Sequence, residues 1–151
     1  MEGIDDMTAK EYLSELQLMK TKIEQLQEQK RMYLDGAVSI TAALNPVKVQ
    51  NSPAVDRVGD NVAKATSIDA KIDEEIASLW KKQDGVIRQI QGMHNAKFMQ
   101  LLFKVYVQGK SIRKAAFEMK MSYSYVIELH KKALAEFKKV YADALAERKA
   151  G

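Results

Sequence analysis

Apolar residues recur at steps of three and four along two long stretches of this chain, residues 8–44 and 53–91. In the first stretch the series includes Leu16, Ile23 and Leu26, and Glu, Gln and Lys fill most of the other positions. A repeat near 3.5 residues puts the apolar side chains on one side of an α-helix, as in a coiled coil. The sequence therefore predicts two long amphipathic helices in an all-α protein.

Residues that start or stop helices mark the ends of both stretches. Thr8 and Glu11 have the spacing of a capping box, and Ser52 followed by Pro53 is typical of an N-cap with proline at the first helical position. Because only the short segment 45–52 joins two helices of similar length, we expect a long, coiled-coil-like antiparallel hairpin. Lys30 interrupts the first apolar series, and Asp69 and Gln83 interrupt the second.

A two-helix hairpin makes only a thin hydrophobic core. We therefore expect residues 1–94 to form an arm that self-associates into a homo-oligomer or packs against another protein. Residues 95–151 differ from this arm in charge, since they hold twelve Lys and Arg against five Asp and Glu, a net charge of +7, whereas residues 1–94 carry −3. Such asymmetry predicts different partners for the two parts, with a simple solvated basic surface as the alternative for the second.

The second part, residues 95–151, predicts three shorter helices. Their expected ranges are 96–107, 112–119 and Ser122 to about Leu145. Asn95, Ser111 and Ser122 can each cap the helix that follows, and Gly109 can end the first of the three. This order and spacing are those of a tri-helical helix-turn-helix domain.

The segment LLFKVYVQGKSIRKAAFEMKMSYSYVIELHKKALAEF resembles region 4 of sigma-70-type factors, the helix-turn-helix that reads the −35 promoter element. The matching features are Leu101-Leu102, Tyr106, Gly109, Ala115-Ala116, Met119, Met121-Ser122, Val126 and Ala133-Leu134. The Val126–Leu134 ending and the MTAKEYL start at Met7 are also similar to ArpU/RinA-like late-gene regulators of phages from low-GC Gram-positive bacteria. The resemblance implies a phage-type transcriptional regulator that binds duplex DNA and acts with RNA polymerase on late promoters.

The start of the last helix supplies the candidates for DNA contact, because the inward positions of its apolar face leave other positions outside. The base-reading candidates are Tyr123, Ser124, Ile127 and Glu128. The phosphate-contacting candidates are Lys110, Arg113, Lys114, Ser122, Lys131 and Lys132. Sigma factors often have arginine in these reading positions, and bidentate contact of arginine with guanine is not available here. We therefore expect a mostly electrostatic, salt-dependent affinity.

Four positions in this segment have alternative interpretations. Tyr123 and Tyr125 either face the DNA or pack on the neighbouring hairpin. His130 is expected on the helix surface or partly packed, rather than on a phosphate. Lys120 stands where the family usually has glycine in the turn; if the turn requires a positive φ, lysine there costs about 1 kcal/mol or more.

The composition excludes several classes of function. With no cysteine, two isolated histidines and no glycine-rich loop, neither a nucleophile–base pair nor a metal or cofactor site can be assembled, so we do not expect an enzyme. Neither a signal peptide nor a membrane-spanning apolar run is recognisable, which predicts a cytoplasmic protein without membrane contact. Two alternatives to a transcriptional regulator stay open: a small terminase-like DNA-packaging protein, and a structural coiled-coil protein that does not bind DNA.

Overall fold

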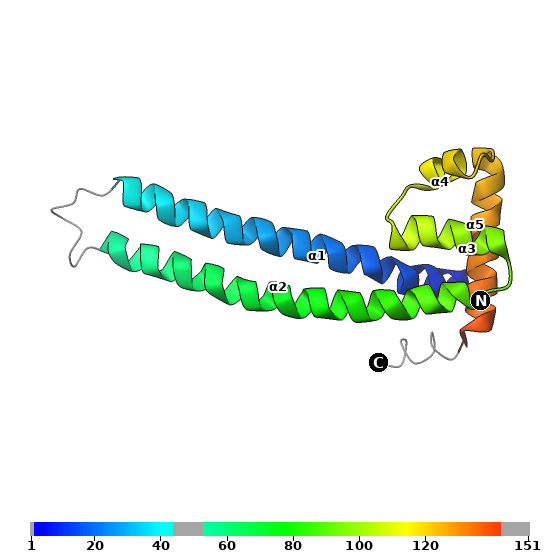
Figure 1. Cartoon of the computed structure of the whole chain (residues 1–151), viewed down its shortest axis with the longest axis horizontal. Coiled ribbons are helices and arrows are strands. Elements are labelled where there is room, and N and C mark those ends of the chain that lie inside the picture. Colours follow the sequence, from blue (N-terminus) through cyan, green and yellow to red (C-terminus); the bar gives the residue numbers. More distant parts are fainter. Residues whose placement is uncertain (1, 44–52, 143–151) are drawn as a thin grey trace. The chain divides into compact units, whose positions relative to one another are not determined.

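The computed structural model describes residues 2–43 and 53–142, and the side chains of residues 9–37 and 56–142. Within these residues the prediction of an all-α protein is confirmed, since they form five α-helices and one π-helix and no β-strand (Figure 1). The helices are α1 Glu2–Ala43, α2 Pro53–Gln91, α3 Ala96–Leu102, the π-helix η2 Phe103–Val107, α4 Ile112–Glu118 and α5 Tyr123–Val140. Across the described ranges, no helix combines the length and the apolar character needed to cross a bilayer.

The observed helix limits differ from the expected ones at the start of α1. This helix begins at Glu2, so Thr8 lies inside it and does not cap its first turn. The second long helix begins at Pro53, as expected. The predicted segment 45–52, with its Ser52 cap, lies outside the described residues. The last helix ends at Val140, because the backbone of Tyr141 leaves the helical conformation, and it does not run unbroken to Leu145 as expected. Residues 143–145 lie outside the described residues.

The chain forms two compact units. The first contains Met1–Leu18 and Trp80–Gly151, and the second contains Met19–Leu79. The boundary that the sequence suggested, between residues 94 and 95, lies inside the first unit. The reason is that the start of α1 packs with the end of α2, with η2 and with α5, through contacts of Tyr12 and Gln17.

In the second unit, α1 and α2 run in opposite directions. Lys22 pairs with Glu75 (2.9 Å) and Lys30 pairs with Asp69 (2.7 Å), so the partner's number falls as the chain advances along α1. The buried apolar side chains between these helices are Ile23, Ala37, Ala65, Ile68 and Ile72. The two charges that interrupt the apolar series are therefore partners of one another.

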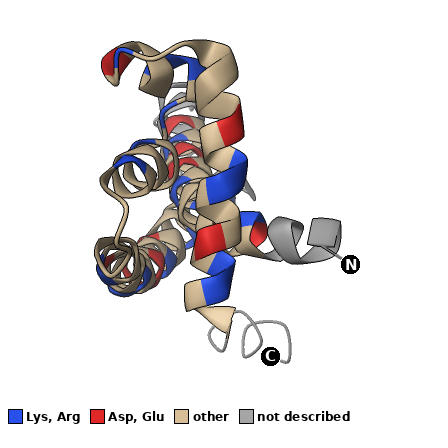
Figure 2. Cartoon of the chain, turned by 90° about the vertical axis from the view of Figure 1, so that its right-hand side faces the viewer, with Lys and Arg blue, Asp and Glu red and all other residues tan. Residues whose placement is uncertain are grey.

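In the first unit, side chains far apart in the sequence meet around α5. The Tyr12 hydroxyl donates to Gln89 Oε1 (2.8 Å), and the Tyr12 ring lies 6.0 Å from that of Phe137, which is fully buried. Lys82 Nζ lies 4.2 Å from the centroid of the Tyr12 ring and 2.7 Å from a Glu15 carboxylate oxygen. Both basic and acidic positions occur along α5 (Figure 2).

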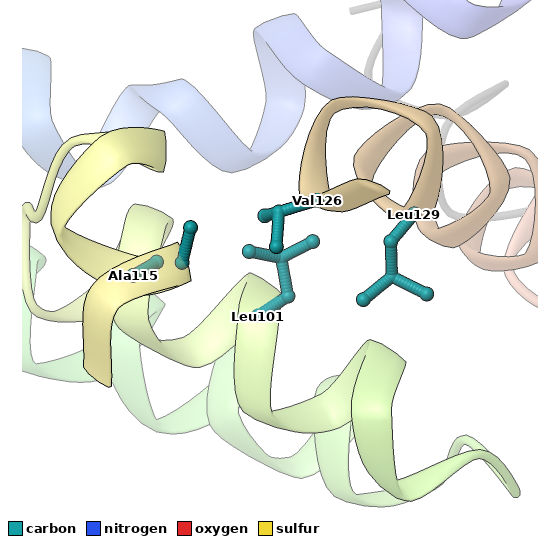
Figure 3. Close-up of a cluster of buried hydrophobic side chains, with 5 residues drawn as sticks. Leu101, Ala115, Val126 and Leu129 are labelled. Atoms are coloured by element: carbon teal, nitrogen blue, oxygen red, sulfur yellow. The ribbon is translucent and has the colours of Figure 1, made fainter. Parts of the chain in front are cut away.

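A second cluster of buried residues joins α3, α4 and α5 (Figure 3). Its members are Leu101, Ala115, Ala116, Val126 and Leu129. The two alanines allow α4 to approach its neighbours closely, because a larger side chain there would separate the helices. Ile112, Met119 and Met121 pack around this cluster as partly buried residues. The cluster fixes α5 against α4, and it leaves the other side of α5 in contact with solvent.

The π-helix η2 ends the segment that leads into α4. Its last amide bond runs from Gln108 N–H to Phe103 O (3.0 Å), and Gly109 follows with a φ of +72°. The carbonyl of Tyr106 accepts from Gln17 Nε2 (3.1 Å), which satisfies a backbone group that the helix end leaves free. A Cβ at Gly109 would lie only 2.8 Å from Gln17 Oε1, so both the conformation and the available space favour glycine there.

Candidate nucleic-acid interface

The turn between α4 and α5 is a Schellman motif. Met121 N–H donates to Ala116 O (3.0 Å) and Lys120 N–H donates to Phe117 O (3.2 Å), which is the pair of bonds that defines this helix ending. Lys120 has a φ of 58°, so the turn does require a positive φ at the position where the family usually has glycine. Because this conformation brings Cβ close to the following carbonyl, lysine pays about 1 kcal/mol that glycine would not pay.

Serine side chains cap both helices of the turn region. Ser111 Oγ accepts from Lys114 N–H (3.0 Å) at the start of α4, and Ser122 Oγ accepts from Tyr125 N–H (3.2 Å) at the start of α5. Each bond satisfies one of the amide groups that a helix start leaves without an intrahelical partner. The accepting role leaves the Ser122 hydroxyl proton available to an outside acceptor such as a phosphate oxygen.

The base-reading candidates lie on the outer side of the first turns of α5. Ser124 and Glu128 are exposed, Tyr123 is 42% exposed, and Ile127 is half-buried. Of the four, Ile127 thus offers least to an approaching ligand. Glu128 lies 3.5 Å from Lys131 Nζ, an exposed pair one helical turn apart. Such pairs contribute little to stability, so either charge can turn to another partner at small cost.

Both tyrosines at the start of α5 contact cations. The guanidinium carbon of Arg113 lies 4.5 Å from the centroid of the Tyr123 ring. Lys97 Nζ lies 5.6 Å from the Tyr125 ring centroid and donates to the Tyr125 hydroxyl at 3.4 Å. Tyr125 remains 46% exposed. These cations come from α4 and α3, so the described contacts of the tyrosines are with the C-terminal helices rather than with α1 or α2.

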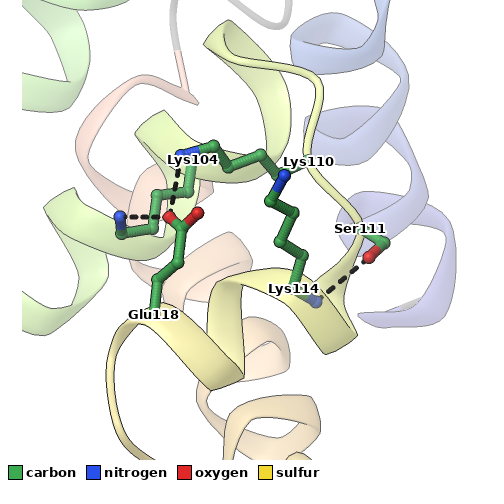
Figure 4. A network of polar contacts seen from close by, with 5 residues as sticks. All are labelled: Lys104, Lys110, Ser111, Lys114 and Glu118. Atoms are coloured by element: carbon green, nitrogen blue, oxygen red, sulfur yellow. Dashed lines mark hydrogen bonds and ion pairs between the residues drawn. The ribbon is translucent and has the colours of Figure 1, made fainter.

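The phosphate candidates fall into two groups. Five of them are exposed: Arg113, Lys114, Ser122, Lys131 and Lys132. Lys110 is half-buried, and its Nζ lies 2.7 Å from Glu118 Oε1, which also accepts from Lys104 Nζ at 2.7 Å (Figure 4). The bonds from Lys104 and Lys110 lower the pKa of Glu118 to about 2. Lys110 therefore shares a charged cluster with a carboxylate, which leaves less of its positive charge for a phosphate.

His130 is buried, at 8% exposure, whereas the sequence led us to expect it on the helix surface or partly packed. Its Nε2 lies 2.7 Å from the Tyr106 hydroxyl, and the two rings stack with centroids 5.7 Å apart. Burial lowers the pKa of His130, and the positive charge of Lys10 lowers it further. Burial also raises the pKa of the Tyr106 hydroxyl. The sequence does contain a signal for this burial, because Val126 and Ala133 place His130 on the buried stripe of α5.

The surface of α4 and α5 offers contact chemistry: hydroxyl groups, exposed cations and aromatic faces. In the part of the chain that the structure describes, no three His, Asp or Glu side chains are placed to hold a metal ion. Comparisons of the chain with known protein families, with curated proteins and with solved structures found no match.

Proposed function

We propose that the chain binds duplex DNA through α4 and α5, with the start of α5 in the major groove, and that it is a phage-type transcriptional regulator. The observation that carries this proposal is the pair α4–α5 itself. A Schellman turn and two serine caps hold the two helices, and the buried cluster around Val126 leaves the outer side of α5 exposed. An exposed helix start beside a second helix is what groove-binding helix-turn-helix proteins use.

Exposed cations both precede and follow the start of α5 in the sequence. Arg113 and Lys114 lie on α4, before the turn, and Lys131 and Lys132 lie further along α5. About four phosphate contacts would give a slope near −3.6 for log affinity against log salt concentration, since each contact on B-DNA contributes about −0.9. The reading positions hold hydroxyl, aromatic and carboxylate groups, so phosphate contacts supply most of the affinity and sequence discrimination is modest.

The second unit would be the part that meets a protein partner. It exposes three large apolar side chains, Met32 at 66%, Val62 at 46% and Leu34 at 39%. Exposed apolar groups on long helices favour association with a further copy or with another protein. The resemblance to sigma region 4 makes RNA polymerase the partner to test first, with self-association of the chain as the other arrangement.

The proposal is tested by titrating the full chain into a labelled duplex library of random sequence at about 50 mM and about 200 mM salt. We expect binding at the lower concentration and a loss of about 100-fold at the higher one, since four contacts give about that factor. The double variant Lys131→Ala, Lys132→Ala should weaken binding on all sequences. The double variant Lys71→Ala, Lys81→Ala removes two exposed lysines of α2 and serves as the matched control.

Three results would contradict parts of this proposal. An absence of binding at the lower salt concentration would exclude the DNA interface. Equal losses in the two double variants would mean that net charge matters and the α5 surface does not. A ring of many copies, seen by mass measurement in solution, would indicate a DNA-packaging role instead of transcriptional control.

A further inference from the structure

One large apolar side chain near the turn is left almost entirely in water. Phe117, on α4, is 83% exposed, the highest value among the exposed large apolar side chains of the described residues. Burying a phenylalanine ring is worth about 1.5–3 kcal/mol relative to leaving it exposed. The Phe117 ring gains almost none of this free energy from the fold, so a ligand that buries the ring would gain it on binding.

Phe117 has two neighbours that make it part of a larger surface. Arg113 lies four residues earlier on α4 and therefore on the same side of the helix. The guanidinium carbon of Arg113 lies 4.5 Å from the Tyr123 ring centroid, which joins α4 to the start of α5 at this point. We call Arg113, Phe117 and Tyr123 the aromatic–arginine cluster. It presents two exposed rings, and the planar cation of Arg113 lies over one of them, that of Tyr123.

The charge around the cluster is positive. Lys114 and Lys120 stand three residues before and three residues after Phe117, and both are exposed. The nearest carboxylate in sequence is Glu118, and it is taken up by Lys104 and Lys110 at 2.7 Å each (Figure 4). A ligand for this surface should therefore be anionic and should also carry flat apolar faces. Unpaired bases of a nucleic acid strand have both properties, because every base has a π-face and every nucleotide a phosphate.

Three other classes of ligand fit these observations less well. An acidic peptide would pair with the cations, but its carboxylates do not stack on the exposed rings. A membrane surface needs a wide apolar face on a longer helix, and α4 has seven residues with both of its alanines buried inside the domain. Double-stranded DNA contacts cations as well, but its stacked bases do not offer their faces to an aromatic ring.

We propose that the aromatic–arginine cluster binds one or two unpaired bases of a DNA strand, which stack on Phe117 and Tyr123 while Arg113 contacts the same strand. This site goes beyond the proposed binding of paired DNA by α5. The chain would then bind a locally opened base-pair step next to the duplex segment that α5 contacts. Stacking on aromatic side chains is tolerant of sequence, so the site would prefer unpaired over paired DNA and not one base over another.

The test compares three labelled probes with the full chain at one salt concentration: a duplex, the same duplex with a short mismatched bubble, and an oligothymidine of equal length. The bubble should bind at least about fivefold more tightly than the duplex, since one stacked base contributes about that factor or more. Phe117→Ala should remove this preference and leave duplex affinity unchanged. Phe117→Tyr keeps the ring and should keep the preference. Leu18→Ala, which removes an exposed apolar side chain elsewhere, is the matched control.

The outcomes separate this inference from the proposed function. Equal binding of bubble and duplex by the unchanged chain, or an equal loss on both probes in Phe117→Ala, would overturn the stacking site and leave duplex binding standing. Binding of oligothymidine and bubble without binding of duplex would support the site and exclude the α5 interface. Binding of none of the probes would exclude both. Displacement of oligothymidine by polyglutamate of equal charge, as readily as by unlabelled oligothymidine, would also overturn it, because charge alone would then explain the binding.

Discussion

The two units of the chain are stabilised in different ways. In the unit Met19–Leu79, two antiparallel helices share a narrow apolar seam flanked by ion pairs such as Lys22–Glu75. In the other unit, α5 packs against segments from the start of α1 and the end of α2. The fully buried ring of Phe137 and the hydrogen bond from Tyr12 to Gln89 join residues far apart in the sequence there. The helix pair of Met19–Leu79 should tolerate local change, whereas the unit around α5 depends on individual side chains.

The largest effect is expected from Phe137→Ala, in the core of the first unit. The side chain is fully buried, and its ring lies 6.0 Å from that of Tyr12 and 4.9 Å from that of Tyr141. Removing it leaves a cavity that costs about 3–5 kcal/mol of unfolding free energy. Phe117→Ala is the same change at an exposed position and should stay within about 0.5 kcal/mol. Urea unfolding followed by circular dichroism measures both.

The same kind of truncation should cost less stability in the second unit. Leu26→Ala removes a half-buried side chain of the second unit, where less apolar area is lost and solvent can fill the space. We expect a cost of about 1 kcal/mol, well below that of Phe137→Ala. A cost for Leu26→Ala as large as that of Phe137→Ala would mean that the seam between α1 and α2 is as closely packed as the core around α5.

The buried His130 should make the first unit lose stability as the pH falls. Its pKa in the folded chain lies below the usual 6.5, because burial and Lys10 disfavour the charged form. The unfolded chain therefore binds the proton more readily, and the stabilisation present above about pH 6.5 is lost as the pH falls toward the folded pKa. Each unit of difference between the two pKa values corresponds to about 1.4 kcal/mol.

Thermal unfolding between about pH 8 and about pH 5 measures this effect. His130→Gln removes the titrating group and should flatten the curve over the range in which histidine titrates. His94→Gln changes an exposed histidine and should leave the loss at low pH in place. Tyr106→Phe removes the hydroxyl partner of His130 and should cost about 1–3 kcal/mol at neutral pH, since a buried nitrogen then lacks its hydrogen bond. An unaltered pH profile in His130→Gln would contradict this account.

Relief of the strained turn should raise stability by a smaller amount. Lys120→Gly replaces lysine by a residue that adopts the left-handed conformation without steric cost. The gain is reduced by the larger freedom of glycine in the unfolded chain, so we expect about 0.5–1 kcal/mol. Lys120→Ala removes the same charge without relieving the turn and should give no gain. A gain of equal size in both variants would indicate a charge effect instead.

The sequence predicted features that depend on neighbouring residues, and it did not predict those that depend on distant contacts. Periodicity predicted the long helices, and the serines at 111 and 122 predicted where α4 and α5 begin, because these signals involve neighbouring residues. The hydrogen bond from Tyr12 to Gln89 joins residues 77 positions apart, and no local pattern indicates it. The start of α1 and the end of α2 belong to the first unit through contacts of this kind, which is why the division into units could not be predicted.

The candidate interface shows the same limit at the scale of single residues. The helical period correctly separates the exposed Ser124 from the buried Val126. It does not indicate that Lys110 pairs with Glu118, since this contact depends on how the segment before α4 folds back toward it. Nor did the sequence direct attention to Phe117, although a phenylalanine outside the apolar series of α4 was a readable signal.

The smallest effect is expected in the second unit, at Lys30 and Asp69. Their side chains are partly exposed and their charges lie 2.7 Å apart, a type of pair that contributes about 0–1 kcal/mol. Either single change to alanine should therefore cost less than about 1 kcal/mol. The double variant Lys30→Leu, Asp69→Leu continues both apolar series and should be neutral or stabilising, because apolar packing often replaces an ion pair without loss. A double variant that is less stable than the unchanged chain would show that the pair specifies how α1 and α2 align. The second unit would then depend on individual side chains as the first one does.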